Sequence, residues 1–572
     1  MKFIERIENE LNEALKKIGA EETALITFSD RPELSNFQTN IAFSLAKKLR
    51  KAPMMIANEI VENINSTYFK AFAVAPGFIN FTLNDNYFAE IFEKINADER
   101  AGIEKIQGRK IVLDYGGPNV AKPLHVGHLR SAVIGETLKR LSNYMGNETI
   151  GDVHLGDWGL QMGLVIAGIL EKFDCNFFFN GTGEKPVFTE ENLEKIYPES
   201  ALRAKSDENF KKYAQEITVK LQNKEKGYYE IWKEIREISV SAIKKIYNQL
   251  DVSFDLWNGE SDADEYVPKV FEILNSKNLI EKSNGAEIVN VERETDNSPM
   301  PPVIVRSSAG AELYATTELA TIVSRVEDFK PDGIWYLTDN RQSMHFKQVF
   351  RVCDLAEIGK GVEFVHIPFG TVNGQDGKPF KTRDGGTMYL SDLISLIEKA
   401  CEEKIRESGK VQNENEIKEL ANEIGECAIK FGDLINHPSK DYIFDIPKFC
   451  SFEGKTGPYV QYCLVRINSI LEKAGNFEEN YQVSTDEEKN LIINLIKFAN
   501  DVETANLEHA PNIFVQSAYN LATSFSSLYN KIKILGEENE ERRNTLLTLI
   551  KCVEKSLKIF ANLIGIKIPK KM

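Results

Sequence analysis

The chain has 572 residues, of which 42% are hydrophobic and 27% are charged, and its formal net charge is −16. This length suggests about four domain-sized units, and the composition is typical of a water-soluble globular protein. No apolar run approaches the roughly 20 residues of a membrane span, and the charged first eight residues do not resemble a signal peptide, so no membrane association is expected.

The seven cysteines lie far apart, with no Cys-x-x-Cys pair and no histidine at metal-ligand spacing. This pattern predicts free thiols, a cytoplasmic location and no tightly bound metal. The acidic net charge governs solubility and long-range steering, whereas nucleic-acid binding needs only a local basic face. Basic clusters are present at residues 47–51 and 567–571. Charge therefore decides neither for nor against a nucleic-acid partner.

Residues 1–100 mix helical and strand patterns. A charged amphipathic start is followed by predicted helices at residues 40–49 and 54–64. Residues 71–83 then alternate like strands around a Pro-Gly turn. We interpret this region as a small α/β domain without a catalytic constellation.

The most informative local pattern lies at residues 110–144. Residues 110–114 predict a buried strand, and apolar residues recur at helical spacing from 129 to 144. Between them, His125-Val126-Gly127-His128 predicts a turn at a helix N-terminus, where free backbone N–H groups and the helix dipole favour an anion such as phosphate. The imidazoles can donate hydrogen bonds to a nucleotide, and Gly127 lets it approach the backbone. A plain surface turn is the alternative.

A second strand-like run ends near Asp152, and a helix is predicted after the sequence Gly156-Asp157-Trp158-Gly159. Strand, helix and strand form the first half of a doubly wound parallel sheet, whose ligands bind at the carboxyl ends of the strands. Asp157 and Gln161 open the predicted helix, so helix capping is the simplest account of these two residues.

Residues 175–260 are richer in charge and have helical patterns. We interpret them as an insertion between the halves of the sheet, and we expect residues 192–212 to be partly flexible. The sheet is expected to resume with the strand-like runs at residues 288–291 and 302–306.

A further helix is predicted at residues 313–320, with Thr316 or Thr317 as a possible cap. Residues 334–339 then predict another buried strand of the sheet, which is followed by a polar stretch that contains Gln342.

Residues 374–387 form a basic segment with glycines at both ends, which predicts a mobile loop. Lys378, Lys381 and Arg383 give it concentrated positive charge, which suits the charge that develops on a polyphosphate when its α-phosphorus is attacked. Such a loop alone is usually a solvated hairpin. Its position at the far end of the domain that holds the His125–His128 turn makes it a second signal for nucleotide chemistry.

From about residue 390 the strand signals fade and only amphipathic helices follow. They are predicted at residues 394–406, 417–431, 460–471, 487–502, 513–528 and 542–563. By itself this periodicity indicates a packed helical bundle and no particular function.

Two motifs carry a resemblance to class I aminoacyl-tRNA synthetases, and specifically to the arginyl-tRNA synthetase family of the bacterial type. The stretch Pro118-Asn119-Val120-Ala121-Lys122-Pro123-Leu124-His125-Val126-Gly127-His128-Leu129-Arg130-Ser131 resembles that family's HIGH motif. Residues 374–387 resemble its KMSKS loop, with Lys378 and Lys381 matching the two lysines and Pro379-Phe380 in place of Met-Ser. Two further stretches agree with this resemblance. Residues 452–462 resemble the junction before the family's C-terminal domain. Gly156-Asp157-Trp158-Gly159 resembles a family motif on the rim of the active site, which is the alternative to helix capping for Asp157 and Gln161.

The resemblance covers essentially the whole chain and implies its architecture. It implies a Rossmann-like α/β catalytic domain at residues 101–395 with the helical insertion near 175–260, and a helical connecting segment at 396–454. It also implies that residues 1–100 form an α/β domain that binds the tRNA elbow, and that residues 455–572 form an all-α anticodon-binding domain.

The resemblance also implies an arginine pocket. Asp114, Tyr314 and Glu318 would face the guanidinium, for which carboxylates offer fork-like acceptors. Asn119 and Gln342 would hold the α-amino and carboxylate end. The family usually has Asp where this chain has Glu318, so the pocket geometry there is open; the alternative for Glu318 is an acid in the first turn of a helix, favoured by the helix dipole.

For the nucleotide, the resemblance implies that His125 and His128 hold the α-phosphate of ATP beside Gly127. Lys378 and Lys381 would stabilise the transition-state charge, and Lys122 would share this phosphate role.

For tRNA, the resemblance offers Phe78 and Asn80 as contacts to a base of the D-loop. The alternative is that Phe78 belongs to the core and that Asn80 is a turn residue. Tyr529 and Asn530 are candidates for reading the anticodon.

The implied activity is the two-step attachment of L-arginine to tRNA(Arg). Arginine first attacks Mg-ATP to give arginyl-adenylate, and the 2′-hydroxyl of the terminal adenosine then takes the arginyl group. A monomer is expected, with tRNA(Arg), ATP and L-arginine as partners. Two alternatives stay open: another class I synthetase, such as a cysteinyl or glutamyl enzyme, and a catalytically silent tRNA-binding paralogue.

Overall fold

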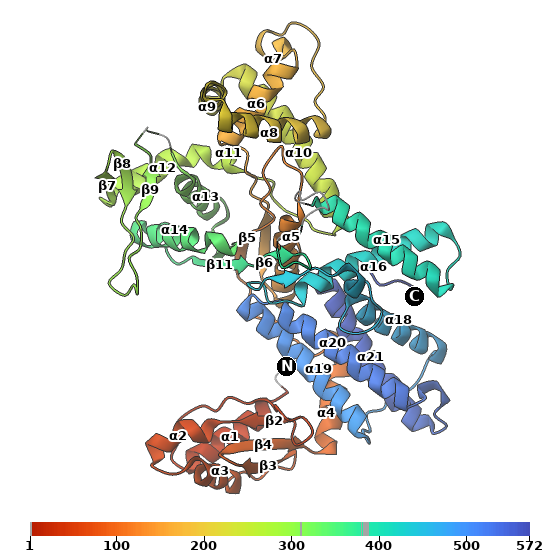
Figure 1. Ribbon diagram of the computed structural model, residues 1–572. Helices are drawn as coiled ribbons and strands as arrows, with labels where there is room; N and C mark the ends of the chain where they lie inside the picture. Colours follow the sequence, from red (N-terminus) through yellow and green to blue (C-terminus); the bar gives the residue numbers. More distant parts are fainter. Residues whose placement is uncertain (1–2, 309, 311, 379, 381–387) are drawn as a thin grey trace. The chain divides into compact units, whose positions relative to one another are not determined.

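The structure is a computed structural model of the 572-residue chain, and it describes residues 3–308, 310, 312–378, 380 and 388–572 (Figure 1). The chain folds into two compact units. One unit holds residues 106–451 and 563–566, and the other holds residues 1–105, 452–562 and 567–572. Lys381 and the rest of residues 381–387 lie outside the described residues, so the loop predicted there is not tested.

A four-stranded parallel sheet is the centre of the unit that holds residues 106–451. Its strand order is β11-β10-β5-β6, and its bounds are Lys110–Asp114 for β5, Glu148–Asp152 for β6, Gly333–Asp339 for β10 and Glu363–Phe369 for β11. The chain crosses from β5 to β6 in one direction along the sheet and from β10 to β11 in the other. The order of connection therefore reverses between β5 and β10, which is where open α/β sheets bind ligands. The predicted doubly wound fold is confirmed.

Three helices connect these strands. They are α5 (Val126–Met145) after β5, α13 (Tyr314–Phe329) before β10, and α14 (Ser343–Ala356) after β10. The first turns of α5 and α14 both follow the carboxyl ends of their strands. The sheet therefore brings the two polar stretches that the sequence singled out, around residues 125 and 342, to one edge.

The prediction that residues 288–291 and 302–306 resume the parallel sheet is wrong. The strands β7 (Ile280–Ser283), β8 (Ala286–Val289) and β9 (Val303–Arg306) form a separate antiparallel sheet. An Asn284-Gly285 turn, with φ of 48° and 79°, closes the β7–β8 hairpin. Asn-Gly is the preferred pair for two-residue hairpin turns in which both residues have positive φ, so these two residues already indicated a local hairpin.

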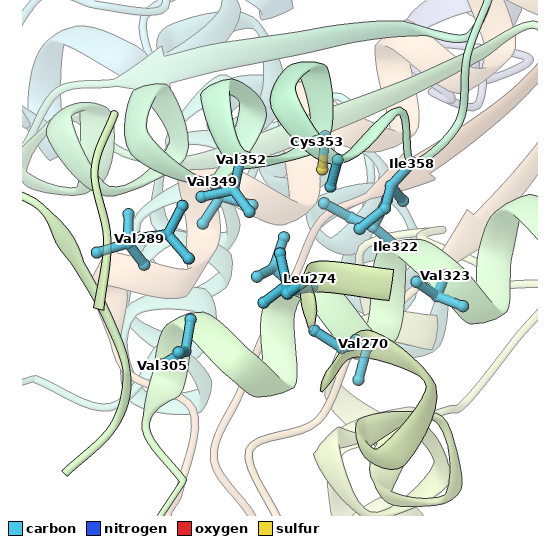
Figure 2. Close-up of a cluster of buried hydrophobic side chains, with 14 of the residues drawn as sticks. Val270, Leu274, Val289, Val305, Ile322, Val323, Val349, Val352, Cys353 and Ile358 are labelled. Carbon is cyan, nitrogen blue, oxygen red and sulfur yellow. The ribbon is translucent and has the colours of Figure 1, made fainter. Parts of the chain in front are cut away.

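This small sheet packs with α12 (Val267–Ser276), α13 and α14 around one shared hydrophobic core (Figure 2). Val289 and Val305 of the sheet join Leu274 of α12 and Val352 of α14 in the same cluster, and all four are buried. The cluster also includes Val112, Ile334 and Tyr336 of the parallel sheet. Packing of this kind holds α13, which carries Glu318, against the central strands.

The predicted helical insertion consists of α7 (Asn176–Asn180), α8 (Glu190–Ser206), α9 (Glu208–Gln222) and α10 (Lys226–Gln249), which follow α6 (Leu160–Lys172). Partial flexibility was expected at residues 192–212, but these residues lie in two capped helices. Thr189 caps α8 through a reciprocal pair of hydrogen bonds with Asn192, and the Asp207 side chain accepts from Phe210 N–H at the start of α9.

The short helix α11 (Glu260–Ala263) ends the insertion, before β10. After the last strand of the parallel sheet and the basic segment come α15 (Leu390–Ser408) and α16 (Glu414–Leu434). The two-residue strands β12 (Val372–Asn373) and β13 (Tyr442–Ile443) pair in parallel, and α17 (Ile446–Phe449) follows. The predicted helices at 394–406 and 417–431 are confirmed within α15 and α16.

The other unit joins the first 105 residues to the C-terminal helices. The first 105 residues contain an antiparallel sheet with the strand order β1-β2-β4-β3 and the four helices α1 to α4. In chain order, the elements are α1 Glu5–Lys17, β1 Thr27–Phe28, β2 Phe37–Thr39, α2 Ile41–Leu49, α3 Pro53–Glu62, β3 Phe69–Val74, β4 Phe78–Leu83 and α4 Asp85–Ala97. The second half of the unit is helical, with α18 Gly457–Ala474, α19 Asp486–Glu508, α20 Asn512–Lys531 and α21 Glu540–Ile564.

Polar contacts tie the two halves of this unit together. The Lys555 ammonium of α21 donates to the carbonyl oxygens of Asn96 and Asp98, at 2.6 and 2.9 Å, and Asn96 Nδ2 donates to the Tyr481 hydroxyl at 2.9 Å. The small α/β domain and the helical bundle that the sequence predicted are both present.

All seven cysteines are buried and none forms a disulfide, in agreement with the predicted free thiols. Within the described ranges, no helix combines the length and the apolar character that crossing a bilayer requires.

Candidate active site

A pocket of about 520 Å³ opens at the carboxyl ends of β5 and β10. This is the edge at which the direction of strand connection reverses, as expected for an open α/β sheet. The pocket is lined by residues from six parts of the chain: Asp114, Gly116, Gly117, Asn119, His125, Gly127, His128, Ser131, His154, Gly156, Glu260, Tyr314, Glu318, Leu337, Thr338, Asp339, Arg341, Gln342, Phe346 and Phe369. The structure thus brings together eight of the predicted site residues: Asp114, Asn119, His125, Gly127, His128, Tyr314, Glu318 and Gln342.

The two histidines cap their own helix. His125 is the N-cap residue of α5; its Nδ1 accepts from Gly127 N–H, and Nδ1 of His128 accepts from His125 N–H, both at 3.0 Å. The ring centroids lie 4.0 Å apart. A ring nitrogen that accepts a hydrogen bond carries no proton, so in each neutral ring the proton lies on Nε2.

The environment keeps both rings neutral. The pKa of His128 is lowered to about 3, mainly by burial and to a smaller extent by the neighbouring His125. The pKa of His125 is also lowered, first by burial and then by the charge of Lys122. At neutral pH each ring therefore offers one Nε2–H donor and no charge.

The prediction that free backbone N–H groups of this turn bind an anion is wrong for its first three amides. Val126 N–H donates to Met388 O, Gly127 N–H donates to His125 Nδ1, and His128 N–H donates to His125 O. The ring Nε2–H groups are the donors that remain. A Cβ on Gly127 would lie 2.7 Å from Cε1 of His125, so glycine here makes room for the folded-back ring.

Three buried charged side chains meet beside the pocket. Arg325 of α13 donates from Nη2 to Asp114 Oδ2 and to Asp152 Oδ2, each at 2.7 Å. Asp114 and Asp152 end the neighbouring strands β5 and β6, and all three side chains are less than a tenth exposed. An internal guanidinium therefore already pairs with Asp114, the acid that the sequence placed against the substrate guanidinium.

Glu318 differs from Asp114 in having an open acceptor. It is buried, and no described residue forms a hydrogen bond to its Oε1. Burial raises its pKa to about 7; His154 lowers the pKa and Asp114 raises it. Because α13 begins at Tyr314, Glu318 lies beyond the first turn of the helix, so the alternative of a first-turn acid is wrong.

Tyr314 and Gln342 face the same pocket. The Tyr314 ring packs against His345 with centroids 4.7 Å apart and the ring planes tilted by 36°. Gln342 Oε1 is buried without a hydrogen-bond partner among the described residues. Asn119 and Gly156 form an isolated β-bridge, and a Cβ atom added to Gly156 would lie 2.2 Å from Asn119 Oδ1. Gly156 thus lets the Asn119 side chain lie at the pocket wall.

The sequence reasoning missed Glu260, a second acid of the pocket. It is the first residue of α11, and burial raises its pKa. The segment before it pairs with the extension of β6 through the bridges Asp152–Leu256 and Leu155–Gly259. The available signal was topological: an insertion that leaves the sheet edge after β6 returns to that edge, so the residues at its end reach the site.

Three capping predictions need correction. Asp157 does not open α6: its carboxylate accepts from Arg236 Nε at 2.9 Å and from Ser261 Oγ at 2.8 Å. Gln161 donates from Nε2 to Val120 O. The hydroxyl of Thr316 donates to Val305 O and that of Thr317 to Tyr314 O, so neither caps α13.

The structure does not bring Lys122 or Lys378 into the pocket. The Lys122 ammonium lies 4.5 Å over the Tyr197 ring of α8 and lines a separate, small pocket. Lys378 is exposed in a hairpin in which Gly374 N–H donates to Lys378 O at 2.7 Å. Lys381 lies outside the described residues.

The tRNA candidates all lie in the other unit. Phe78 is half-buried and contacts the Phe43 ring edge to face, with centroids 5.2 Å apart. Asn80 is buried inside β4, so it is not a turn residue. Tyr529 is partly exposed on α20, with the Arg466 guanidinium 4.9 Å from its ring centroid, and Asn530 is exposed.

Family models match three consecutive parts of the chain. Residues 5–83 match the arginyl tRNA synthetase N terminal domain, residues 90–446 match the catalytic domain of tRNA synthetases class I (R), and residues 460–572 match the DALR anticodon binding domain. The second of these models alone spans more than half of the chain.

Individual relatives agree with the family models. The chain is 43% identical to the arginine--tRNA ligase of Alkaliphilus oremlandii over 96% of each sequence, and 43% identical to that of Agathobacter rectalis over the full length of both. It superposes on the crystal structure of arginyl-tRNA synthetase from Plasmodium falciparum with a TM-score of 0.83 and 25% identity, covering 100% of this chain and 99% of the other. The chain therefore belongs to the arginyl-tRNA synthetase family of class I aminoacyl-tRNA synthetases.

Proposed function

We propose that the pocket at the ends of β5 and β10 is where this arginine–tRNA ligase activates L-arginine with ATP. One observation carries the proposal: two neutral imidazoles, each with its proton on Nε2, line the same pocket as a buried carboxylate whose Oε1 has no partner among the described residues. The donors suit a phosphate and the carboxylate suits a guanidinium. Both substrates of the first step are therefore matched within one pocket of about 520 Å³.

We assign the arginine side chain to the acidic part of the pocket. Glu318 is the principal partner of the guanidinium because its Oε1 is open, and Glu260 and Tyr314 line the same space. Asp114 acts mainly through Arg325, which it already binds. Asn119 and Gln342 hold the α-amino and carboxylate groups. The acids of this pocket favour a cationic amino acid over an acidic one.

ATP, the nucleotide of this class, enters as its Mg²⁺ complex in our proposal. His125 and His128 donate to its α-phosphate, and Gly127 allows the ring geometry that they need. Lys378 and Lys381 act on the leaving pyrophosphate from the basic segment. Lys378 must move to do so, because it does not line the pocket. Lys122 joins them only after leaving the Tyr197 ring.

The first step then needs no nucleophilic side chain. The arginine carboxylate attacks the α-phosphorus, pyrophosphate leaves, and arginyl-adenylate forms. In the second step the 2′-hydroxyl of the terminal adenosine of tRNA attacks the arginyl carbonyl and AMP leaves. The chain contributes positioning and hydrogen-bond donors placed for developing charge.

The tRNA contacts remain proposals at residue level. Phe78, with Phe43 beside it, offers an aromatic surface for a base of the D-loop, and Asn80 supports that strand from inside the sheet. Tyr529 and Asn530 offer a ring and an amide for the anticodon. We further propose that the enzyme acts as a monomer in the cytoplasm, which sedimentation and cell fractionation test.

The decisive test is aminoacylation of total tRNA with each of the twenty labelled amino acids, ATP and Mg²⁺. Charging with arginine alone supports the assignment. Charging with a different amino acid means that the pocket has been misassigned and favours another class I synthetase. Binding of tRNA without charging by any amino acid favours the silent paralogue.

The pH dependence of arginine binding tests the role of Glu318. Its pKa in the free enzyme is raised to about 7, so it is mostly neutral below that pH, and only the ionised form pairs with a guanidinium. We expect KM for arginine to rise about tenfold per pH unit below pH 7 and to be flat above it. Initial rates between pH 5.5 and 8.5 measure this. In Glu318→Gln, KM for arginine should not rise as the pH falls. A wild-type KM for arginine that is constant from pH 5.5 to 8.5 would contradict the proposed role of Glu318.

Replacing His125 by asparagine separates its two roles. The asparagine oxygen can still cap α5, but no donor remains where Nε2–H lay. We expect kcat to fall on the order of 100- to 1000-fold, with little change in the melting temperature. His125→Ala, which removes the cap as well, is the comparison and should melt earlier. An Asn variant that keeps full activity would remove His125 from the phosphate site.

A further inference from the structure

The described ends of the basic segment are anchored in different ways. At its exit, Val126 N–H donates to Met388 O at 3.1 Å and Leu390 N–H donates to Leu124 O at 2.9 Å. The exit is thus tied directly to the His125–His128 turn. The entry has no such tie in the described residues. It lies on the stretch 437–444, where β12 pairs with β13.

Backbone contacts at the entry are close. Gly370 N–H donates to Pro438 O at 2.9 Å, and Thr371 N–H donates to Asp441 Oδ1 at 2.7 Å. A Cβ on Gly370 would lie 2.6 Å from the carbonyl carbon of Lys440. The chain that leads into the basic segment therefore keeps its place only if residues 438–441 keep theirs.

Arg130 holds residues 437–444 against α5, the helix that begins at the His125–His128 turn (the HVGH turn). It lies two residues after His128 in α5 and is 1% exposed. Its Nε donates to Asp433 Oδ1 at 2.9 Å, its Nη1 donates to Lys440 O at 2.7 Å, and its Nη2 reaches His437 O at 3.5 Å. One guanidinium thus fastens the end of α16 and the stretch after it to α5.

We infer that Arg130 is a positioning residue that sets the distance between the HVGH turn and the entry of the basic segment, and so prepares the ATP site from both sides. The inference rests on the proposed nucleotide roles of His125 and Lys378. A planar fork that reaches a carboxylate and two carbonyl groups in fixed directions does this well, and lysine, with one nitrogen, cannot reproduce it. Misplacement by about 1 Å can cost a factor on the order of 100 in rate.

The test uses variants of the full-length chain and steady-state aminoacylation. For Arg130→Met we expect kcat/KM for ATP to fall on the order of 100-fold, while KM for arginine changes less than about twofold. Arg130→Lys, which keeps a charge beside Asp433, should fall between this variant and the wild type. Gly370→Ala perturbs the same junction without touching Arg130 and should give the same selective loss of ATP use, even if Arg130→Met folds poorly.

Arg351 provides a matched control. It is also a buried arginine on a helix that follows a strand of the parallel sheet. Like Arg130 it binds a carboxylate, that of Asp296, and a backbone carbonyl oxygen, that of Val291, although it reaches one carbonyl group and Arg130 reaches two. It has no contact with the basic segment among these bonds. We expect Arg351→Lys to lower the melting temperature as Arg130→Lys does, with both kinetic parameters within about twofold of wild type.

Amide hydrogen exchange supplies a readout that does not depend on activity. The Gly370 and Thr371 amides should exchange faster in Arg130→Lys than in wild type, and not in Arg351→Lys. If ATP and arginine kinetics fall equally in the Arg130 and Gly370 variants, or if these variants behave like Arg351→Lys, the inference is wrong. If His125→Asn and Lys378→Ala leave ATP kinetics unchanged, the proposed nucleotide site fails instead.

Discussion

Glu318→Gln is expected to lower kcat/KM for arginine by roughly 30-fold to 3000-fold, which corresponds to about 2–5 kcal/mol for truncating a buried charge pair. Glu318 is buried and its Oε1 has no partner in the described chain, so the substrate guanidinium is the charge that it is placed to meet. Glutamine keeps the shape and one oxygen but loses the charge. Aminoacylation rates at pH 8, with arginine varied at saturating ATP and tRNA, measure the loss.

Glu318→Asp is the control for this change. It keeps the charge and withdraws the carboxylate by one methylene, so we expect a smaller loss than for glutamine. KM for ATP should stay within about twofold in both variants, since the imidazoles that we propose as phosphate donors are intact. An unchanged arginine dependence in Glu318→Gln would transfer the main role to Glu260, whose own glutamine variant would then show the large effect.

Arg325→Met is expected to reduce the free energy of unfolding by about 3–5 kcal/mol, because it leaves two buried carboxylates without their partner. Arg325 binds both Asp114 and Asp152 at 2.7 Å, and all three are almost fully buried. Urea or thermal unfolding followed by circular dichroism measures the loss.

Two further variants isolate the cause. Arg325→Met combined with Asp114→Asn and Asp152→Asn removes the buried charges and should regain part of the lost stability. Arg341→Met breaks an ion pair with Asp339 whose arginine is 83% exposed, and it should cost less than about 1 kcal/mol. If Arg325→Met and Arg341→Met had the same free energy of unfolding, the buried ion pairs of Arg325 with Asp114 and Asp152 would contribute no more to stability than the exposed pair does.

Local patterns in the sequence predicted the central elements well. The apolar run at residues 110–114 is β5, the run at 334–339 lies in β10, and the HVGH turn begins α5 as expected. Each of these depends on burial and on periodicity within one segment, which the order of residues carries directly. The pocket positions around 114 and 125 followed from the rule that ligands bind at the strand ends of a parallel sheet, whereas Gln342 was identified through the family resemblance.

Long-range pairing was not predictable in the same way. Nothing local to Arg325 in the middle of α13 tells that it reaches Asp114 and Asp152, which precede it by 211 and 173 residues. Glu260 likewise enters the pocket only because the insertion returns to β6. The antiparallel sheet at residues 280–306 was missed for another reason: short β-branched runs fit a buried parallel strand and a local hairpin equally well, and the Asn-Gly turn between β7 and β8 was the deciding signal.

The reciprocal cap formed by His125 and His128 affects whether either histidine can be acylated. An imidazole attacks an acyl group through its unprotonated nitrogen, and here both unprotonated Nδ1 atoms are occupied by backbone N–H groups of their own turn. The other ring nitrogens, Nε2, carry protons. In the proposed site, a mixed anhydride such as arginyl-adenylate would therefore meet two histidines without acylating either one, and the activated arginine would be preserved for the tRNA hydroxyl.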